Sequence, residues 1–271
     1  MANSKKIAFL IGMVVLAIAL SIFLFNYYSS MESFSVKTFL IKSNIPLGGE
    51  TTEKIRLVNN RDSPKEFKVY FNDFKDFGEI EESEFVLDAR ETKEIGVKFK
   101  DNLKKAGIHP GNIIIESNSL TKRIPVVVGV EDPNHIFTII QKIIPDYSSI
   151  SPGESFGMDI KVFDTMGINV PSVNAKYYIA NLDGETIWSD EGNLIVGGDL
   201  IKMINVPLEW DYGDYVFVTS INYKGIDSIS SQLFTISEKK GEIFSGNIKF
   251  FSFIIVLFVF IILILFFYFL Q

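Results

Sequence analysis

The sequence contains no cysteine, and this absence excludes several kinds of chemistry at once. Disulfide bonds, thiolate zinc sites and cysteine nucleophiles all require a thiol. Secreted eukaryotic domains of this size are usually braced by disulfides, so a cysteine-free chain with domains outside the cell is typical of a prokaryotic surface protein. We therefore expect domains that are stabilised by core packing alone.

Histidine is scarce as well, because the chain has two, His109 and His135. Neither lies in an HExxH zinc motif or beside a GxSxG serine, and no glycine-rich phosphate loop is followed by Lys-Ser or Lys-Thr. We expect both histidines to be solvated loop residues. The sequence predicts no catalytic residue and no cofactor, and hence a protein that is not an enzyme.

Basic residues are not in excess. The formal net charge is -7, and most of the acidic surplus lies in the second half of the chain. Proteins that bind nucleic acid neutralise phosphates with clustered lysine and arginine. We therefore expect no nucleic-acid partner.

Two long apolar segments, 7–27 and 250–270, lie near the ends of the sequence. Each is long enough as a helix to cross the ~30 Å hydrocarbon core of a bilayer, so we expect two transmembrane helices in contact with membrane lipid. The first is longer than the apolar region of a signal peptide and has no A-x-A site after it, which favours an uncleaved signal anchor. The alternative is a cleaved signal peptide, which leaves one span.

Lysines near the segment ends predict the topology. Lys5 and Lys6 favour a cytoplasmic start at 1–6, and two spans then place the middle of the chain outside. Three lysines in the polar tether 238–249 favour the opposite orientation, so cytoplasmic domains remain the alternative. We expect a two-pass protein of the cell membrane with extracytoplasmic domains.

The middle of the chain shows the period-2 alternation of half-buried strands and no sustained helical period. Phe67, Val69 and Phe71 alternate with polar neighbours, for example. We expect strands in the first half at residues 35–42, 52–58, 65–72, 84–88, 92–99, 111–117 and 122–130. Short strands at this density predict a β-sandwich.

The second half repeats the pattern of the first. A Pro/Gly/Glu turn at 46–50 precedes one apolar strand, and a similar turn at 151–154 precedes another. Late hairpins that begin at Gly111 and Gly213 match in the same way. Such a repeat predicts two tandem sandwiches, 33–131 and 134–237, joined by a short linker.

The motifs of both halves resemble known modules. They are the segments 46–50, 85–87, 93–97 and 124–128 in the first half, and 151–154, 177–185 and 212–216 in the second. The first unit resembles immunoglobulin-like modules of archaeal and bacterial surface proteins and of secreted glycosidases. The second is similar to macroglobulin-like or cell-adhesion-type sandwiches. The resemblance implies an all-β fold of two tandem immunoglobulin-like β-sandwiches flanked by the transmembrane helices, in a membrane-anchored archaeal surface protein. Such modules act as spacers or binding surfaces.

Oxygen-bearing side chains gather at the predicted linker. Glu131, Asp132 and Asn134 lie within four positions, and carboxylate and amide oxygens are ligands of calcium. These three residues are therefore calcium candidates, although calcium takes six or more oxygens and the other ligands are not identifiable. The alternative is a rigid proline linker around Pro133.

An aromatic residue beside carboxylates forms a second candidate. Trp210, Asp211 and Tyr212 fall in a predicted loop, where an indole face could stack on a sugar ring. These residues are glycan-binding candidates. The alternative is that Trp210 covers the end of the sandwich core.

These patterns favour a non-catalytic membrane-anchored protein. It would present two extracytoplasmic immunoglobulin-like domains for protein–protein interaction or adhesion, or as an accessory subunit of an envelope complex. The expected partner is another envelope or membrane protein. The alternative is a sensory ectodomain that binds a glycan or calcium.

Overall fold

The structure is a computed structural model that describes residues 33–72, 74, 77–118, 120–145 and 149–238. The predicted cytoplasmic start 1–6, the helices 7–27 and 250–270, and all but the first residue of the tether 238–249 lie outside these residues. Within the described part of the chain, no helix is long and apolar enough to cross a membrane.

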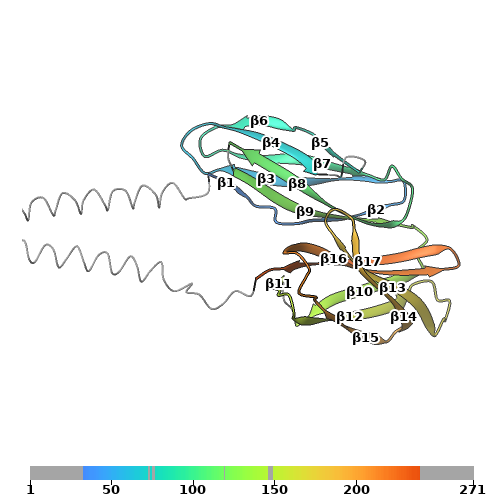
Figure 1. The fold of residues 1–271 in the computed structure, drawn as a ribbon. Helices are drawn as coiled ribbons and strands as arrows, with labels where there is room; N and C mark the ends of the chain where they lie inside the picture. The colour runs from blue at the N-terminus through green and yellow to red at the C-terminus, as the bar shows by residue number, and fades with distance from the viewer. Residues whose placement is uncertain (1–32, 73, 75–76, 119, 146–148, 239–271) are drawn as a thin grey trace, which may run out of the picture.

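The described residues form two β-sandwiches, each made of two sheets (Figure 1). The first sandwich contains β1 (Phe34–Val36), β2 (Ile41–Pro46), β3 (Glu50–Asn59), β4 (Lys65–Asn72), β5 (Gly78–Ile80), β6 (Glu84–Leu87), β7 (Thr92–Lys100), β8 (Gly107–Ser117) and β9 (Leu120–Glu131). The second contains β10 (Phe137–Ile144), β11 (Ser149–Ile150), β12 (Ser155–Asp164), β13 (Ser172–Asn181), β14 (Thr186–Ile195), β15 (Asp199–Asn205), β16 (Gly213–Tyr223) and β17 (Ile226–Ile236). The predicted all-β fold with two sandwiches is confirmed.

The two sandwiches share one topology. The sheets have the orders β1-β3-β7-β5 and β2-β9-β8-β4-β6 in the first sandwich, and β10-β12-β15 and β11-β17-β16-β13-β14 in the second. Every strand of the second sandwich has a counterpart in the first, where β5 is an addition. In both, the first strand pairs antiparallel within one sheet and the next strand pairs parallel with the last strand of the other sheet.

The prediction of one strand over 35–42 is wrong. The chain leaves one sheet after Val36 and enters the other at Ile41, so that β1 and β2 close edges of different sheets. Phe34 and Ile41 are nonetheless both buried in the same core, each from its own sheet. An apolar pattern that continues across such a switch does not reveal the change of sheet.

The repeated turns have the same backbone geometry. Gly48 and Gly153 have φ angles of 71° and 82°, in the left-handed region that glycine adopts without steric cost. After each of them the chain enters the third strand of its sandwich, β3 or β12. The turn residues of the sequence repeat therefore mark equivalent points of the two folds.

The strands in which apolar and polar residues alternate bury only one of their two faces. In β4, Phe67, Val69 and Phe71 are buried in the first core, and the residues between them are not. The strands β9 and β16 differ, because consecutive residues are buried along much of their length. Burial of both faces of a strand produces a continuous apolar run.

The second buried face of β9 and β16 is the contact between the two sandwiches. Val127, Val216 and Val218 form a separate buried cluster, against which Ile108, Tyr178, Leu182 and Leu233 pack. We call these seven residues the interdomain cluster. Figure 1 shows the sheet of β9 and β8 beside the sheet of β17 and β16, with the two sandwiches side by side. The described chain begins and ends at the same end of this pair.

Candidate functional site

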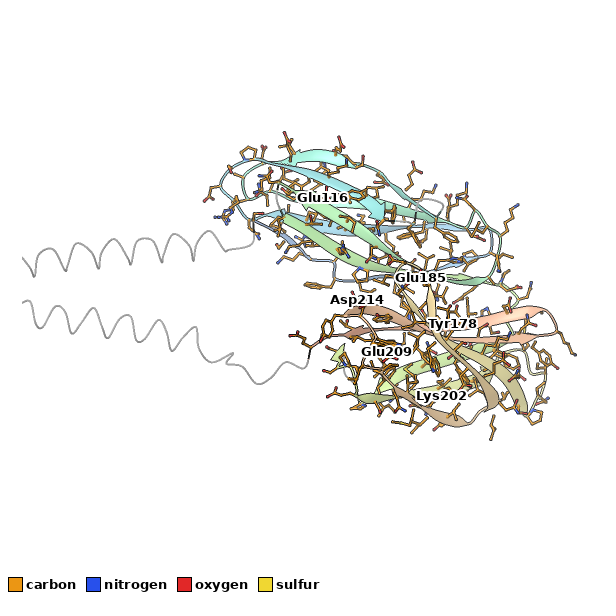
Figure 2. All side chains as sticks on the ribbon, in the orientation of Figure 1. Glu116, Tyr178, Glu185, Lys202, Glu209 and Asp214 are labelled. Carbon is orange, nitrogen blue, oxygen red and sulfur yellow. The ribbon has the colours of Figure 1, made fainter. Side chains whose placement is uncertain are left out.

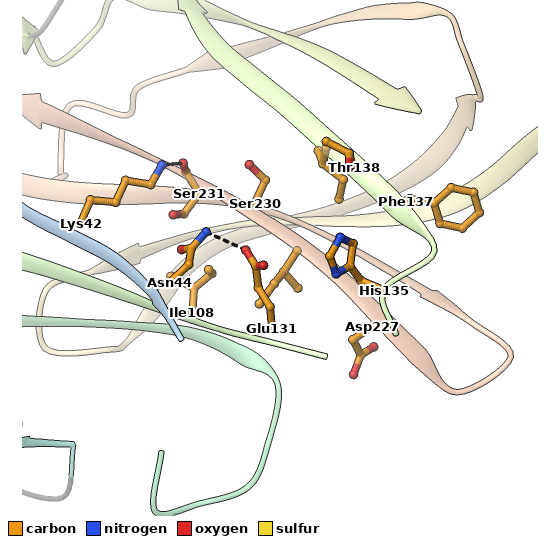
Figure 3. A pocket seen from close by; sticks show the side chains of 12 residues that line it. Lys42, Asn44, Ile108, Glu131, His135, Phe137, Thr138, Asp227, Ser230 and Ser231 are labelled. Atoms are coloured by element: carbon orange, nitrogen blue, oxygen red, sulfur yellow. Dashed lines mark hydrogen bonds between the residues drawn. The ribbon is translucent and has the colours of Figure 1, made fainter. Parts of the chain in front are cut away.

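A cavity of about 230 Å³ lies between the two sandwiches, and charged and polar side chains dominate its walls (Figure 3). Lys42, Asn44 and Glu131 reach it from the first sandwich. The second sandwich contributes the turn before β10, with His135, and the strand β17, with Ser231. The cavity is therefore a polar margin of the apolar interdomain contact.

Two hydrogen bonds cross or border this cavity. The Lys42 Nζ donates to the Ser231 carbonyl oxygen at 2.6 Å, which ties the edge strand β2 of the first sandwich to the last strand of the second. The Asn44 Nδ2 donates to the Glu131 Oε1 at 2.6 Å. Burial lowers the pKa of the Lys42 ammonium, since a charged group loses hydration between the sandwiches.

Gly129 leaves space for the side chains that line the cavity. A Cβ atom at Gly129 would lie 2.6 Å from the Asn44 Oδ1 and 3.4 Å from the Ile108 Cδ1. The parallel pairing of β2 with β9 places Asn44 directly opposite Gly129. Asn44 and Ile108 can therefore meet the second sandwich across the backbone of residue 129.

The side chains of the calcium candidates Glu131 and Asp132 make hydrogen bonds to different partners. The Glu131 carboxylate accepts from Asn44, whereas the Asp132 Oδ1 accepts from the Asn134 N–H at 2.9 Å within its own turn. The Asp132 carbonyl oxygen accepts from the His135 N–H at 3.0 Å. Among the described residues, no group of three or more His, Asp or Glu side chains is placed to hold a metal ion.

Trp210 lies in the predicted loop, between β15 and β16, and covers the end of the second core. Its ring stacks on Tyr215 with the centroids 6.0 Å apart, and Tyr215 in turn stacks on Phe234 at 5.8 Å. The Tyr215 hydroxyl donates to the Asp211 carbonyl oxygen at 2.9 Å. This link from the start of a strand to the residue four positions earlier is the tyrosine corner of immunoglobulin-like domains.

An open groove of about 780 Å³ runs beside Trp210. Tyr212 and Leu208, 61% and 78% exposed, line it together with the carboxylates of Glu154 and Glu209. In Figure 2, Glu209 lies toward the end of the molecule where the described chain terminates. One face of the Trp210 ring thus packs against the core, and exposed Tyr212 borders the groove.

A lysine links the edge strands of the two sheets of the second sandwich. Lys202 lies on the core side of β15, and its Nζ is 2.5 Å from the Asp190 Oδ2 of β14 in the opposite sheet. The ammonium also lies 4.6 Å from the centroid of the Tyr177 ring and 5.8 Å from that of Trp188. The Lys202 ammonium is therefore surrounded by aromatic rings and a carboxylate of the second sandwich, and it lies far from the first sandwich (Figure 2).

The expectation that His109 is a solvated loop residue is wrong. It lies in β8, and its ring stacks on Phe77 with the centroids 4.0 Å apart. Burial lowers the pKa of His109, against the opposing effect of the Asp101 carboxylate. His135 does lie beside a turn, with its Nδ1 3.1 Å from the Asp132 carbonyl oxygen.

Sequence reasoning missed Lys42, Asn44 and the interdomain cluster. A signal for the cluster was present, because the apolar run at 124–130 and the run at 215–218 do not alternate. Two strands with both faces apolar, one in each half of the chain, indicate a second buried surface. Lys42 and Asn44 alternate with buried residues of β2 and carry no such signal.

No protein-family model and no curated protein matches the chain. Similar solved structures include a protein of unknown function from Porphyromonas gingivalis W83, with 13% identity over 76% of this chain and 98% of that chain and a TM-score of 0.40. The D0-D1 domain of intimin has 11% identity over 74% and 96%, with a TM-score of 0.38. The PapD-like domain 7 of human CEP192 has 10% identity over 38% and 87%, with a TM-score of 0.33. These distant likenesses concern the sandwich fold alone.

Proposed function

We propose that this chain is a non-catalytic, membrane-anchored protein of a prokaryotic, archaeal cell surface. It presents its two immunoglobulin-like sandwiches outside the membrane as one rigid unit that binds another envelope or membrane protein, in adhesion or as an accessory subunit. The observation that carries the proposal is the interdomain cluster, because it holds the sandwiches side by side. Both ends of the described chain then lie at one end of the unit. In the sequence, one apolar segment precedes the described residues and the other follows them.

The rigid contact supports a binding role over that of a flexible spacer. Sandwiches that serve only as spacers gain length when they are arranged end to end, whereas these two are folded back on each other. Their side-by-side packing combines surfaces of both domains into one. A partner that contacts both sandwiches would meet a surface already ordered before binding.

The orientation is tested with cysteines, since the chain has none of its own. Val86→Cys in β6 and Ile195→Cys in β14 place a thiol at exposed positions of the first and the second sandwich. Both should react with a membrane-impermeant maleimide in intact cells. Reaction that begins only after the cells are lysed contradicts the extracytoplasmic placement.

The binding role is tested by mild cross-linking in native membranes, followed by purification of the full chain. We expect a defined protein partner whose yield falls when Val127→Asp separates the sandwiches. Val86→Asp, an added charge on an exposed strand, is the matched control and should leave the yield unchanged. Recovery of the chain without any protein partner contradicts the proposal.

A second candidate function rests on the groove beside Trp210. Exposed Tyr212 with the neighbouring carboxylates offers an aromatic and acceptor surface that suits a glycan in a sensory ectodomain. Tyr212→Ala is the informative variant, because Trp210→Ala would also disturb the core. Glycan-array signals that vanish in Tyr212→Ala support this function, and a wild-type protein without signals contradicts it.

A further inference from the structure

The described chain ends on the rim of the groove beside Trp210. Its last residue, Glu238, belongs to the groove lining. The exit of the chain is fixed in place, because the Ser237 N–H donates to the Ile150 carbonyl oxygen at 3.0 Å. The next residue of the tether is therefore bonded to the wall of the groove.

Acidic side chains surround this groove. Of its ten described lining residues, four carry a carboxylate and none is a lysine or an arginine. The carboxylates belong to Glu154, Glu209, Asp211 and Glu238. Because like charges around one hollow add up to a negative potential, the groove attracts cationic groups.

Exposed apolar surface accompanies the carboxylates. Leu208 and Tyr212 both line the groove and are both exposed. The Leu208 side chain lies over the turn at Gly153, where a Cβ atom would be 3.1 Å from its Cδ2. The groove therefore suits a segment in which cationic and apolar side chains lie close together in sequence.

The tether has this composition. Two lysines come directly after Glu238, and an isoleucine and a phenylalanine follow at 243–244. From this match we infer that the groove is the docking site of the tether segment 239–244. The lysines pair with the carboxylates of the groove, and the two apolar side chains cover Leu208 and Tyr212.

The covalent link favours this segment over a separate molecule as the occupant. Five residues of extended chain from Glu238 reach at most ~18 Å, which keeps the segment beside the groove. A connection as short as this gives an effective concentration in the millimolar range. Glu242 opposes the docking, because it reduces the net charge of the segment from +2 to +1. The two lysines nevertheless come first, next to the carboxylates of the groove.

The docked segment shortens the connection between the second sandwich and the apolar segment 250–270. Only residues 245–249 then separate the two. The docked segment also fills the groove that the second candidate function assigns to a glycan, so the two uses exclude each other. The docking requires neither the proposed protein partner nor the extracytoplasmic placement, since every residue in the contact belongs to this chain.

Disulfide trapping in the full-length chain tests the docking, because the chain has no native cysteine. Ser151→Cys lies in the groove lining and Ser245→Cys follows the docked segment, and neither change removes a charge or an apolar side chain. In lipid nanodiscs, mild oxidation should give an intramolecular disulfide between them. Ser172→Cys paired with Ser245→Cys is the control and should give none. Ser172 is exposed and begins β13, whose other end pairs with Tyr215 near the groove.

Charge reversal distinguishes docking from mere proximity. Lys239→Glu together with Lys240→Glu should slow the trapping about tenfold, which corresponds to ~1.4 kcal/mol. Lys249→Glu makes the same change outside the docked segment, so it is the matched control and should leave the rate unchanged. Reversal of the groove by Glu209→Lys and Asp211→Lys should restore trapping of the charge-reversed tether.

Thermal melts verify that each variant is folded. Trapping with Ser151→Cys that slows when the lysines are reversed supports the docking. A rate that the reversal leaves unchanged, no trapping with Ser151→Cys, or equal trapping with Ser172→Cys overturns the inference. The experiment contains no partner and no glycan, so its failure would leave the proposed function standing.

Discussion

The buried hydroxyl of Tyr177 provides a test in which a deletion should stabilise the protein. Tyr177 is 1% exposed, and its hydroxyl has no hydrogen-bond partner among the described residues. Its ring stacks on Phe217, with the centroids 6.3 Å apart, and faces the Lys202 ammonium. Tyr177→Phe removes the hydroxyl and keeps the ring, so it removes an uncompensated polar group from the core.

An unpaired buried polar group costs ~1–3 kcal/mol, so Tyr177→Phe should raise the free energy of unfolding by ~1 kcal/mol or more. For a sandwich of this size, 1 kcal/mol corresponds to a melting temperature shift of ~4 °C. Burial raises the pKa of Tyr177 to about 12, and the charge of Asp190 adds to this effect. The folded state therefore favours the neutral phenol.

The raised pKa gives the prediction a pH dependence. The folded pKa exceeds that of an unfolded tyrosine, so the stability linked to the neutral phenol is fully present below pH ~10 and is lost as the pH rises toward 12, by roughly 2–3 kcal/mol. Tyr177→Phe does not undergo this loss. The advantage of the variant over the wild type should therefore widen between pH 10 and 12.

Tryptophan fluorescence is the assay, because both tryptophans, Trp188 and Trp210, lie in the second sandwich. Tyr215→Phe is the matched control, since it makes the same chemical change in the same sandwich but breaks the hydrogen bond to the Asp211 carbonyl oxygen. It should destabilise by ~1 kcal/mol. If Tyr177→Phe destabilises as much as Tyr215→Phe, the hydroxyl has a partner and the reasoning fails.

Three further substitutions, one of them with a matched control, test other parts of the fold. Asp101→Ala leaves three backbone N–H donors without their carboxylate acceptor, at 2.7, 3.1 and 2.8 Å, and should cost ~2–3 kcal/mol, read as faster hydrogen exchange in the first sandwich. Gly129→Ala should cost ~1–3 kcal/mol in thermal unfolding by overpacking the interdomain contact, whereas Gly192→Ala, whose Cβ would lie 3.6 Å from the Tyr177 Cε2, should be near neutral. Lys202→Met removes the cation–π contact with Tyr177 together with the ion pair to Asp190, and should cost ~1–2 kcal/mol in the fluorescence melt.

The sandwiches themselves could be predicted because their strands alternate. Phe67, Val69 and Phe71 each lie in the core where the pattern places them. The three-residue strand β5 is too short to show a period, and the switch from β1 to β2 leaves the apolar pattern intact. Both features depend on the second sheet of the sandwich, which local sequence does not describe.

The candidate site was less accessible to sequence reasoning. Asn44 and Glu131 meet because β2 runs parallel to β9, a pairing between the first and last parts of one sandwich. Lys42 reaches Ser231 because the two sandwiches fold back on each other. Neither contact has a local motif, and near this site the sequence shows only the oxygen-rich composition of the linker. The proposed function and orientation remain predictions for the experiments described above.

The central claim is that the two sandwiches form one rigid unit through the interdomain cluster. Its most direct test is a distance distribution by pulsed electron resonance, with spin labels at Val86→Cys and Ile195→Cys and with unlabelled chains in excess to suppress contacts between copies. The account predicts one narrow distribution, which broadens when Val127→Asp disrupts the cluster. A broad distribution in the otherwise native chain, unchanged by Val127→Asp, would contradict it.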